Sequence, residues 1–274
     1  MSKIKRIFGD IFWHFHQGTN MKNTFENLYA CRKSTKTFEE INKKVFGDVY
    51  AGDIVDPCGF STMEDLQTLE RYFLKFNPKE NGPKKIIDLA CGRGGAGLWL
   101  AQRSGSSLLG FDLSEIAIED ARKRIPDFGM EGRAKFEPQD IRAIPAKTGE
   151  YDFAMCIDSL FIIPDKDAVL AEIFRVLKPG GQFVCFTWEV RRVMAVHDYR
   201  PLLTKAGFQI DTYEEVPGWR ERQKGMHEEL LANKDRLISE MNKKAASVWL
   251  NCAKYELAHL DQMRRVSFLA VAKK

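Results

Sequence analysis

The fold is decided by the stretch KKIIDLACGRGGAGLWLA, residues 84–101. Ile86, Ile87 and Leu89 are apolar and β-favouring, so residues 84–89 predict a short buried strand. Gly92, Gly94 and Gly97 then form a GxGxxG turn, and the residues from Leu98 onward favour a helix. Glycines let a ligand approach bare main chain, and a helix N-terminus offers N–H groups with a partial positive charge. The stretch therefore predicts a strand, a turn and a helix that together cradle a ligand.

The acid Asp88 narrows the choice of ligand. A GxGxxG turn alone is a weak signal, because it also suits a nicotinamide dinucleotide. Asp88 lies four residues before Gly92, at the end of the predicted strand, where its carboxylate would repel a pyrophosphate. It would instead suit a ligand that carries cationic amino and sulfonium groups. A tight turn that binds no ligand is the alternative.

Three strings resemble class I S-adenosylmethionine-dependent methyltransferases of the small-molecule type. IIDLACGRGG (86–95) is similar to motif I of that family, GFDLSEIAIEDAR (110–122) continues its pattern, and RVLKPGGQFVCFTWE (175–189) is a second anchor. The resemblance covers roughly residues 50–216 and the closing strand. It implies an α/β fold with a doubly wound, mostly parallel seven-stranded sheet, helices on both faces and an antiparallel last strand. It also implies S-adenosylmethionine as the cofactor.

Hydrophobic periodicity and turn signals place the remaining elements. Further strands are predicted at 107–111, 135–137, 151–157, 182–188, 208–216 and 266–271, and helices at 166–177 and 197–206. Ser61 and Glu64 match a capping box that opens a helix running to Phe76. The Lys-Pro-Gly-Gly run at 178–181 predicts a turn.

Amphipathic segments flank this core. Apolar residues of 1–16 fall on one stripe, which fits a helix in a lid or dimer contact, or a helix on a membrane surface. Apolar spacings of three, four and seven predict a long amphipathic helix or a helical hairpin at 220–262. We therefore divide the chain into a helical N-terminal lid segment (1–62), a Rossmann-like cofactor-binding core (63–216), a helical cap insertion (217–263), and the last core strand with the tail (264–274).

Acidic residues follow the next two predicted strands. Asp112 lies 20 residues after Gly92, where an acid hydrogen-bonds ribose hydroxyls in Rossmann-like folds, and a simple N-cap is the alternative. Asp140 and Ile141 lie where related enzymes contact the adenine amino group, and a surface turn is the alternative. The other residues that we predict to bind the cofactor are Tyr50, Phe60, Thr62, Asp88, Ala90, Cys91, Gly92, Gly94, Leu113, Cys156 and Ile157.

The site of methyl transfer is expected beyond the carboxyl ends of the strands. The resemblance implies direct displacement at the sulfonium, in which the protein mainly holds the acceptor and the methyl group in line. His197 or Asp158 is predicted to act as a base or to orient the acceptor, and a structural histidine is the alternative. The predicted substrate-binding residues are Trp188, Glu189 and Tyr199.

Length, charge and cysteine content limit the metal sites, location and partners that we expect. The chain has 274 residues, a net charge of +4 and six scattered cysteines without CxxC spacing, so we predict no metal site. The cysteine pattern and the absence of a secretory apolar run predict reduced thiols and a cytoplasmic location. The expected partner is a small-molecule acceptor, with no nucleic acid and no stable membrane insertion, in a monomer or homodimer. The alternatives are an RNA or protein methyltransferase and a catalytically silent S-adenosylmethionine-binding module.

Overall fold

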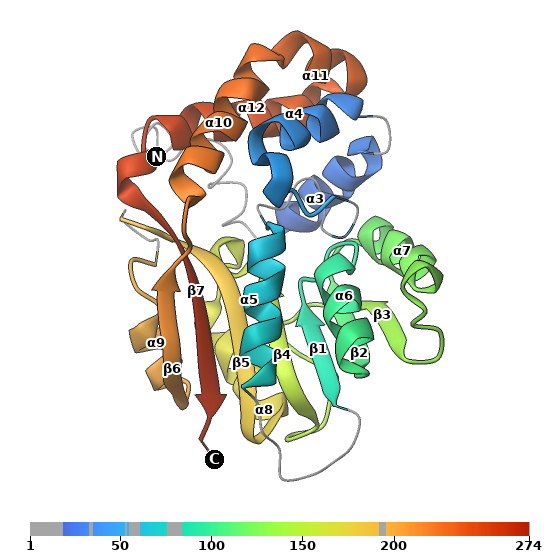
Figure 1. Ribbon diagram of the computed structural model, residues 1–274, viewed down its shortest axis with the longest axis vertical. Coiled ribbons are helices and arrows are strands. Elements are labelled where there is room, and N and C mark those ends of the chain that lie inside the picture. The colour runs from blue at the N-terminus through green and yellow to red at the C-terminus, as the bar shows by residue number, and fades with distance from the viewer. Residues whose placement is uncertain are drawn as a thin grey trace.

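A computed structural model describes residues 19–32, 35–52, 54, 61–75, 84–191 and 196–273. A seven-stranded sheet crosses its centre in the order β3-β2-β1-β4-β5-β7-β6 (Figure 1). Neighbouring strands from β3 to β5 pair in parallel, and β7 pairs antiparallel with both β5 and β6. The strands are β1 (Lys85–Leu89), β2 (Ser107–Asp112), β3 (Ala134–Pro138), β4 (Tyr151–Ile157), β5 (Leu177–Val190), β6 (Phe208–Glu215) and β7 (Met263–Ala272). This arrangement confirms the predicted doubly wound α/β fold.

Helices cover both faces of the sheet. One face carries α5 (Met63–Leu74), α6 (Gly95–Ser104) and α7 (Glu115–Arg124), and the other carries α8 (Lys166–Val176) and α9 (Arg200–Lys205). Ile86 packs with the first group and Ile87 with the second, because the side chains of a strand alternate between faces. Short 3-10 turns occur at Gly47–Val49 (η1), Pro126–Phe128 (η2), Leu160–Ile162 (η3) and Leu260–Gln262 (η4).

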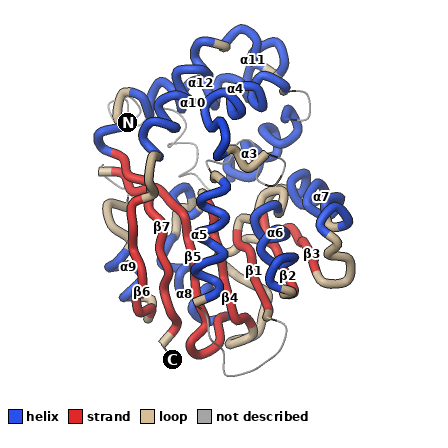
Figure 2. The backbone as a smooth tube through the Cα atoms, viewed as in Figure 1, coloured by secondary structure: helices blue, strands red, loops and turns tan. Residues whose placement is uncertain are grey.

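A helical cap lies beyond the carboxyl ends of the parallel strands, and Figure 2 shows it as a layer of helices separate from the sheet. The cap helices are α3 (Thr19–Arg32), α4 (Lys36–Phe46), α10 (Trp219–Ala232), α11 (Lys234–Glu240) and α12 (Lys243–Leu257). Their shared apolar core includes Leu28, Phe38, Met226, Leu230 and Ala245. The cap is therefore built jointly from the N-terminal segment and from the insertion before β7. The predicted helix at 1–16 lies outside the described residues.

Polar contacts also join the two parts of the cap. Lys44 Nζ lies 2.7 Å from Glu229 Oε1, and Thr37 N donates to Glu240 Oε2 at 2.9 Å. These contacts place α4 along α10 and α11. Within the residues described above, no helix combines the length and the apolar character needed to cross a membrane.

The insertion folds as three helices, so the prediction of one long helix or a hairpin is wrong. α10 ends at Ala232, and α11 ends at Glu240. The side chain of Asn242 accepts a hydrogen bond from Ala245 N at 2.9 Å and caps the start of α12. An N-cap residue has non-helical backbone angles, so this cap interrupts the helix that the apolar spacing alone would continue.

The capping box of α5 lies one residue later than predicted. Thr62 Oγ1 accepts a hydrogen bond from Asp65 N, and the Asp65 carboxylate accepts one from Thr62 N. The predicted pair, Ser61 and Glu64, has the same spacing but does not form the box. Sequence spacing could not choose between two overlapping candidates one residue apart.

Two further boundaries differ from the prediction. α9 begins at Arg200 instead of residue 197, because Pro201 favours the first turn of a helix. β5 begins at Leu177, so the run at 178–181 predicted as a turn belongs to the strand. A register shift between Tyr151 and Phe153 on β4 accommodates it.

Leu230 tests whether the cap packs as tightly as a core. Its side chain is 0% exposed within the cap. Leu230→Ala should lower the free energy of unfolding by about 2–5 kcal/mol, because it deletes buried methyl groups and leaves a cavity. Urea unfolding measures the change. Ile238→Ala is the matched control, since Ile238 is exposed on α11, and should alter stability by less than about 0.5 kcal/mol. Equal effects of the two variants would contradict a packed cap.

Candidate functional site

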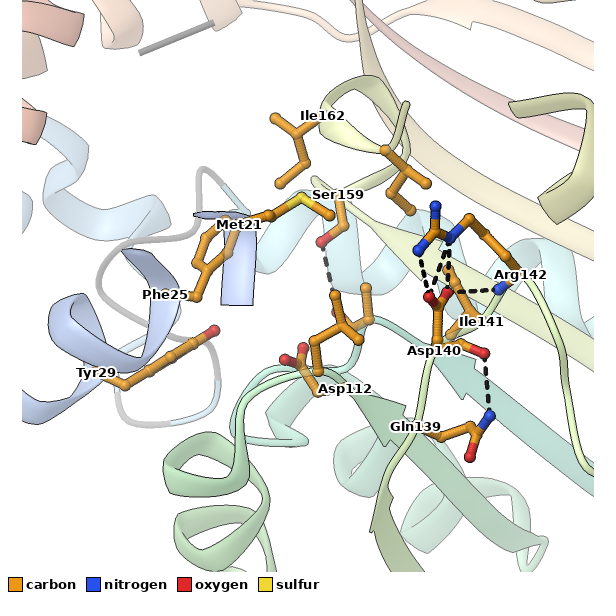
Figure 3. Close-up of a pocket in the computed structure, with 13 residues that line it drawn as sticks. Met21, Phe25, Tyr29, Asp112, Gln139, Asp140, Ile141, Arg142, Ser159 and Ile162 are labelled. Carbon is orange, nitrogen blue, oxygen red and sulfur yellow. Dashed lines mark hydrogen bonds and ion pairs between the residues drawn. The ribbon is translucent and has the colours of Figure 1, made fainter. Parts of the chain in front are cut away.

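A pocket opens at the carboxyl ends of β1, β2 and β4, on the side that faces α3 (Figure 3). Its empty volume, which includes open solvent, is about 580 Å³. Strand order reverses between β1 and β4, and ligands of open α/β sheets bind at such a reversal. The lining residues are Met21, Phe25, Tyr29, Ala90, Asp112, Leu113, Gln139, Asp140, Ile141, Arg142, Ser159, Ile162 and Ile163.

The pocket brings together residues that the sequence analysis selected from three separate strand ends. Ala90 follows β1, Asp112 and Leu113 end β2, and Asp140 with Ile141 follows β3. These five were all predicted to bind the cofactor. Their convergence follows from topology, because the carboxyl ends of parallel neighbours meet at one edge of the sheet.

Two non-glycine residues with positive φ lie at this end of the pocket: Ala90 lines it, and Asp158 directly precedes the lining residue Ser159. Ala90 has φ 54° after β1, and Asp158 has φ 52° after β4. Ser159 Oγ connects the two turns, since it donates to Ala90 O at 3.4 Å (Figure 3). Such backbone angles are uncommon for residues with a Cβ and cluster at functional sites.

Asp112 holds the glycine turn in place. Its Oδ2 accepts a hydrogen bond from Gly92 N at 2.9 Å, and its Oδ1 accepts one from Ser114 N at 2.9 Å. Gly94 has φ 72°, and a Cβ there would lie 2.5 Å from the Phe136 ring. Gly94 is therefore required by both backbone angle and packing. Asp112 therefore lines the pocket and also accepts hydrogen bonds from the backbone of the glycine turn and of the turn before α7.

Asp88 lies buried beneath the glycine turn and is 3% exposed. A Cβ on Gly97 would come within 2.5 Å of Asp88 Oδ2, so α6 packs directly on this carboxyl. Burial, and then the charge of Asp112, raises the pKa of Asp88 to about 7. Burial also raises the pKa of Asp112. A cationic group bound here would favour the ionised form of both acids.

Asp140 has a cationic partner that the sequence analysis did not identify. Arg142 Nη2 donates to Asp140 Oδ2 at 2.5 Å and Arg142 Nε donates to Oδ1 at 3.0 Å, a fork visible in Figure 3. This bond lowers the pKa of Asp140. Their separation of two residues carries no helical or strand signal that would have predicted the pair. Ile141 also lines the pocket and is largely buried.

The α3 helix supplies a wall that the sequence analysis also did not predict. Met21, Phe25 and Tyr29 are spaced four residues apart, so they lie on one helix face, and Figure 3 shows them opposite Asp112. A Cβ on Gly92 would lie 2.8 Å from Tyr29 Oη. The side chain of Tyr29 therefore reaches the glycine turn. The i, i+4, i+8 spacing was readable, but the face to which it packs was not.

Glu26 fixes α3 on the core. Its Oε1 accepts a hydrogen bond from Glu115 N at 2.7 Å, and its Oε2 accepts one from Ser114 Oγ at 3.1 Å. Lys22 Nζ lies 2.6 Å from Glu115 Oε1. A carboxylate is favourable at a helix N-terminus, so α7 holds Glu26 and thereby the wall of the pocket.

Several predicted cofactor-binding residues do not line the pocket. Thr62 is buried and caps α5, and its backbone pairs with Tyr50 in an isolated bridge. Cys156 lies on β4 and is fully buried in the core on one face of the sheet. Ile157, the last residue of β4, packs against the core on the opposite face. Cys91 lies at the turn, where its N donates to Phe111 O at 2.9 Å. Phe60 lies outside the described residues.

The two predicted catalytic residues have different surroundings. Asp158 forms a two-point ion pair with Arg265 and accepts a hydrogen bond from Ser61 Oγ at 3.0 Å. To act as a base, it would have to give up these partners. His197 is exposed after the end of β5 and is not among the residues that line the pocket.

The predicted substrate-binding residues are all buried at or just after the end of β5, with Trp188 and Tyr199 on opposite faces of the sheet. Trp188 packs edge-on against Trp219, with ring centroids 5.3 Å apart. Glu189 accepts hydrogen bonds from the Tyr213 hydroxyl and, at 2.9 Å, from Arg264 Nε. Tyr199 is 0% exposed, and its amide donates to Glu189 Oε1 at 3.3 Å. None of the three lines the pocket described here.

Comparisons with known proteins agree with the architecture. The family described as "Methyltransferase domain" matches residues 86–181. Methyltransferase GfsG of Streptomyces halstedii is 36% identical over 98 residues, which is 36% of this chain and 35% of that protein. Sterol 4-C-methyltransferase strm-1 of Caenorhabditis elegans is 30% identical over 193 residues, 65% of this chain and 57% of that protein. The chain thus spans less than two thirds of the length of these relatives.

Solved structures share the fold at low identity. A phosphoethanolamine N-methyltransferase 2 of Haemonchus contortus has a TM-score of 0.64 at 18% identity, over 86% of this chain and 56% of that chain. The cyclase SpnF has a TM-score of 0.64 at 20% identity, over 86% of this chain and 93% of that chain. Because one neighbour is a methyltransferase and the other a cyclase, these likenesses establish the fold alone.

The raised pKa of Asp88 makes stability depend on pH. Between about pH 4 and 7 the folded chain holds a proton on Asp88 that the unfolded chain releases, so stability falls as pH rises through this window. Asp88→Asn removes this loss. The variant should match the wild type near pH 4 and gain up to about 4 kcal/mol over it above pH 7.

Urea unfolding of both proteins at several pH values measures this difference. Asp127→Asn, at an exposed position in η2, is the control and should show a difference that does not change with pH. A constant difference between wild type and Asp88→Asn across the window would contradict the raised pKa.

Proposed function

Because the chain belongs to the S-adenosylmethionine-dependent methyltransferases, we propose that it transfers the methyl group of this cofactor to a small-molecule acceptor. The observation that carries the proposal is the convergence of Ala90, Asp112, Asp140 and Ser159 on one pocket at the strand-order reversal. These residues lie at or just after the ends of four different strands, β1 to β4. A dinucleotide would place its pyrophosphate close to buried Asp88. Methyl transfer to an acceptor distinguishes an enzyme from a catalytically silent module that binds the same cofactor.

Each part of the pocket has a proposed task. Both oxygens of Asp112 already accept one backbone hydrogen bond, and each retains a lone pair for a ribose hydroxyl. Leu113 and Ile141 offer apolar contact for the adenine ring, beside Asp140 and its partner Arg142. Ala90 and Ser159 lie at the remaining end, where β1 and β4 meet. The bound cofactor supplies a methyl group on a sulfonium, which leaves as the acceptor's bond to it forms.

The acceptor is proposed to be an apolar small molecule. Named relatives act on sterols and tocopherol, which are apolar ring systems with few polar groups. In this chain, an apolar cluster at the cap-facing ends of β5 and β7 includes Trp188, Val190, Trp219 and Met263. The pocket wall itself carries the apolar side chains of Met21, Phe25 and Ile162, which fits an apolar acceptor better than RNA, which would need exposed basic and aromatic side chains.

A binding experiment on Asp112 tests the cofactor site. Asp112→Ala should weaken S-adenosylmethionine binding roughly tenfold to a hundredfold, because hydrogen bonds to a charged group contribute about 1.5–3 kcal/mol. Titration calorimetry measures this affinity, with NAD as the competing ligand class. Glu131→Ala, at an exposed position after η2, is the control and should bind as the wild type does. Tight NAD binding without S-adenosylmethionine binding would overturn the proposed function.

The acceptor class is tested by methyl transfer from labelled cofactor. Panels of sterols, prenylated phenols, polyketides, RNA and protein extracts serve as acceptors, and released S-adenosylhomocysteine reports turnover. Labelling confined to RNA or protein would replace the proposed small-molecule acceptor.

His197 is proposed as a base or orienting group, and this role stays a prediction. A base is needed only if the acceptor must lose a proton as the bond forms, and such help is typically worth about 10²–10⁴-fold. His197→Ala should therefore cut turnover by about that factor and leave S-adenosylmethionine affinity nearly unchanged. His259→Ala is the control, because His259 Nδ1 bonds Tyr255 O within the cap. A loss below threefold for His197→Ala would make positioning alone sufficient.

A further inference from the structure

A buried ion cluster joins three distant parts of the chain beside the pocket. Arg265 on β7 is 1% exposed, and its guanidinium contacts the carboxylates of both Asp65 and Asp158. Building on the function proposed above, we propose that Arg265 is a positioning residue for methyl transfer. It holds the turn after β4 against α5 and β7, and so sets the place of Ser159 in the pocket wall.

The cluster uses every nitrogen of the guanidinium. Arg265 Nε donates to Asp158 Oδ1 at 3.0 Å and Nη2 donates to Asp158 Oδ2 at 2.9 Å, which makes a two-point fork. Nη1 donates to Asp65 Oδ2 at 2.8 Å. A planar fork sets the orientation of its carboxylate as well as its distance, which the point charge of a lysine does not. The carboxylate of Asp158 is therefore fixed in both position and direction.

The fixed carboxylate belongs to a turn that lines the pocket. Asp158 has φ 52°, an angle that a non-glycine residue keeps only where its surroundings hold it. The next residue, Ser159, lines the pocket and donates to Ala90 O at 3.4 Å. A displacement of Asp158 would therefore move both walls of the pocket at its β1–β4 end.

The same cluster fixes the connection between core and cap. Asp65 is part of the capping box with Thr62, whose backbone pairs with Tyr50 at the end of the N-terminal cap segment. Ser61 donates to Asp158 Oδ2 at 3.0 Å. One guanidinium thus links the entry of α5, the end of β4 and the last strand.

The charges of the cluster allow its positional role to be separated from stability. It contains one guanidinium and two carboxylates. Arg265→Met alone leaves two buried carboxylates without their cation, which is strongly destabilising. Combining Arg265→Met with Asp158→Asn removes one charge of each sign. Asp65 then remains at the N-terminus of α5, where it accepts a hydrogen bond from Thr62 N at 2.8 Å. Asparagine also tolerates the positive φ at position 158.

The test compares the single variant with the double variant. Arg265→Met should lower Tm by roughly 6–20 °C, and the double variant should regain most of that loss. In the double variant, turnover on the acceptor found by the panel should stay about 100-fold below wild type, the cost of a displacement near 1 Å. Affinity for S-adenosylhomocysteine should change less than about threefold, since Asp112 and Asp140 are untouched.

An acceptor-free readout keeps this test separate from the proposed function. Amide hydrogen exchange of residues 158–163 should be at least tenfold faster in the double variant than in the wild type, with S-adenosylhomocysteine bound to both. The matched control is Lys178→Met with Asp152→Asn. It removes a 2.8 Å pair between Lys178 Nζ and Asp152 Oδ1 at the opposite end of β4, and should leave turnover and this exchange unchanged.

If the double variant regains wild-type hydrogen exchange and turnover along with its Tm, the positioning role is wrong. Equal losses of exchange protection and turnover in the control variant would also overturn it. If the wild type methylates no acceptor, the proposed function fails, and the exchange result alone decides the role of Arg265. If the double variant does not fold, Arg265→Lys serves instead, because it keeps the charge without the fork.

Discussion

Two backbone turns with positive φ, at Ala90 and Asp158, are the constraint on which the site depends. Each costs on the order of 1–3 kcal/mol and persists only where the surrounding structure holds it. Strand order brings the two turns side by side, because β1 and β4 are neighbours in the sheet. Both segments leave the sheet at these turns, and Ala90 and Ser159 within them line the pocket. The Ser159 hydroxyl lies between the turns, 3.1 Å from Ile157 O and 3.4 Å from Ala90 O, and so links β4 to β1.

The electrostatics of the site follow from the same geometry. The glycine turn lets α6 approach β1 so closely that Asp88 is buried beneath it, and Asp112 is tied to the turn above. Burial raises the pKa values of both acids, since a low-dielectric environment disfavours their charged forms. A cofactor with a sulfonium and an ammonium offsets that cost on binding. Cofactor binding and ionisation of these two acids are therefore coupled. Without the ligand, burial disfavours the ionised form of both acids, and the bound cations offset that cost.

Local sequence patterns predicted the core of the site because each depends on neighbours along the chain. Strand β1, the glycine turn and Asp112 at the end of β2 were readable from periodicity and from the interval of 20 residues after Gly92. The doubly wound sheet followed from the family strings. The roles assigned to Trp188, Glu189 and Tyr199 rested only on their place after β5, which says nothing about the direction in which each side chain points.

Long-range contacts were beyond the reach of the sequence. Arg265 meets Asp158 across 107 residues, and Glu26 meets Glu115 across 89, with no periodic signal for either pair. The same holds for the helix face of Met21, Phe25 and Tyr29. The spacing of these residues places them on one face of a helix but does not show which element that face contacts. Residues supplied by the strand ends are predictable from the fold, whereas residues supplied by added helices are not, because their docking is set by individual contacts.

The joint origin of the cap has a consequence for how the site forms. α3 supplies the pocket wall, but it packs in a core with α10 and α12, which lie some two hundred residues further along the chain. The cap can therefore complete the wall only after the insertion is present and folded. The cap is attached to α7 through Glu26, which binds the N-terminus of that helix. This helix N-terminus belongs to the core and does not depend on the sequence of the cap. Met21, Phe25 and Tyr29 of α3 line the same pocket as Asp112 and Asp140. A change in the inner surface of the cap would therefore reshape this pocket while the strand ends that supply its acids stay as they are.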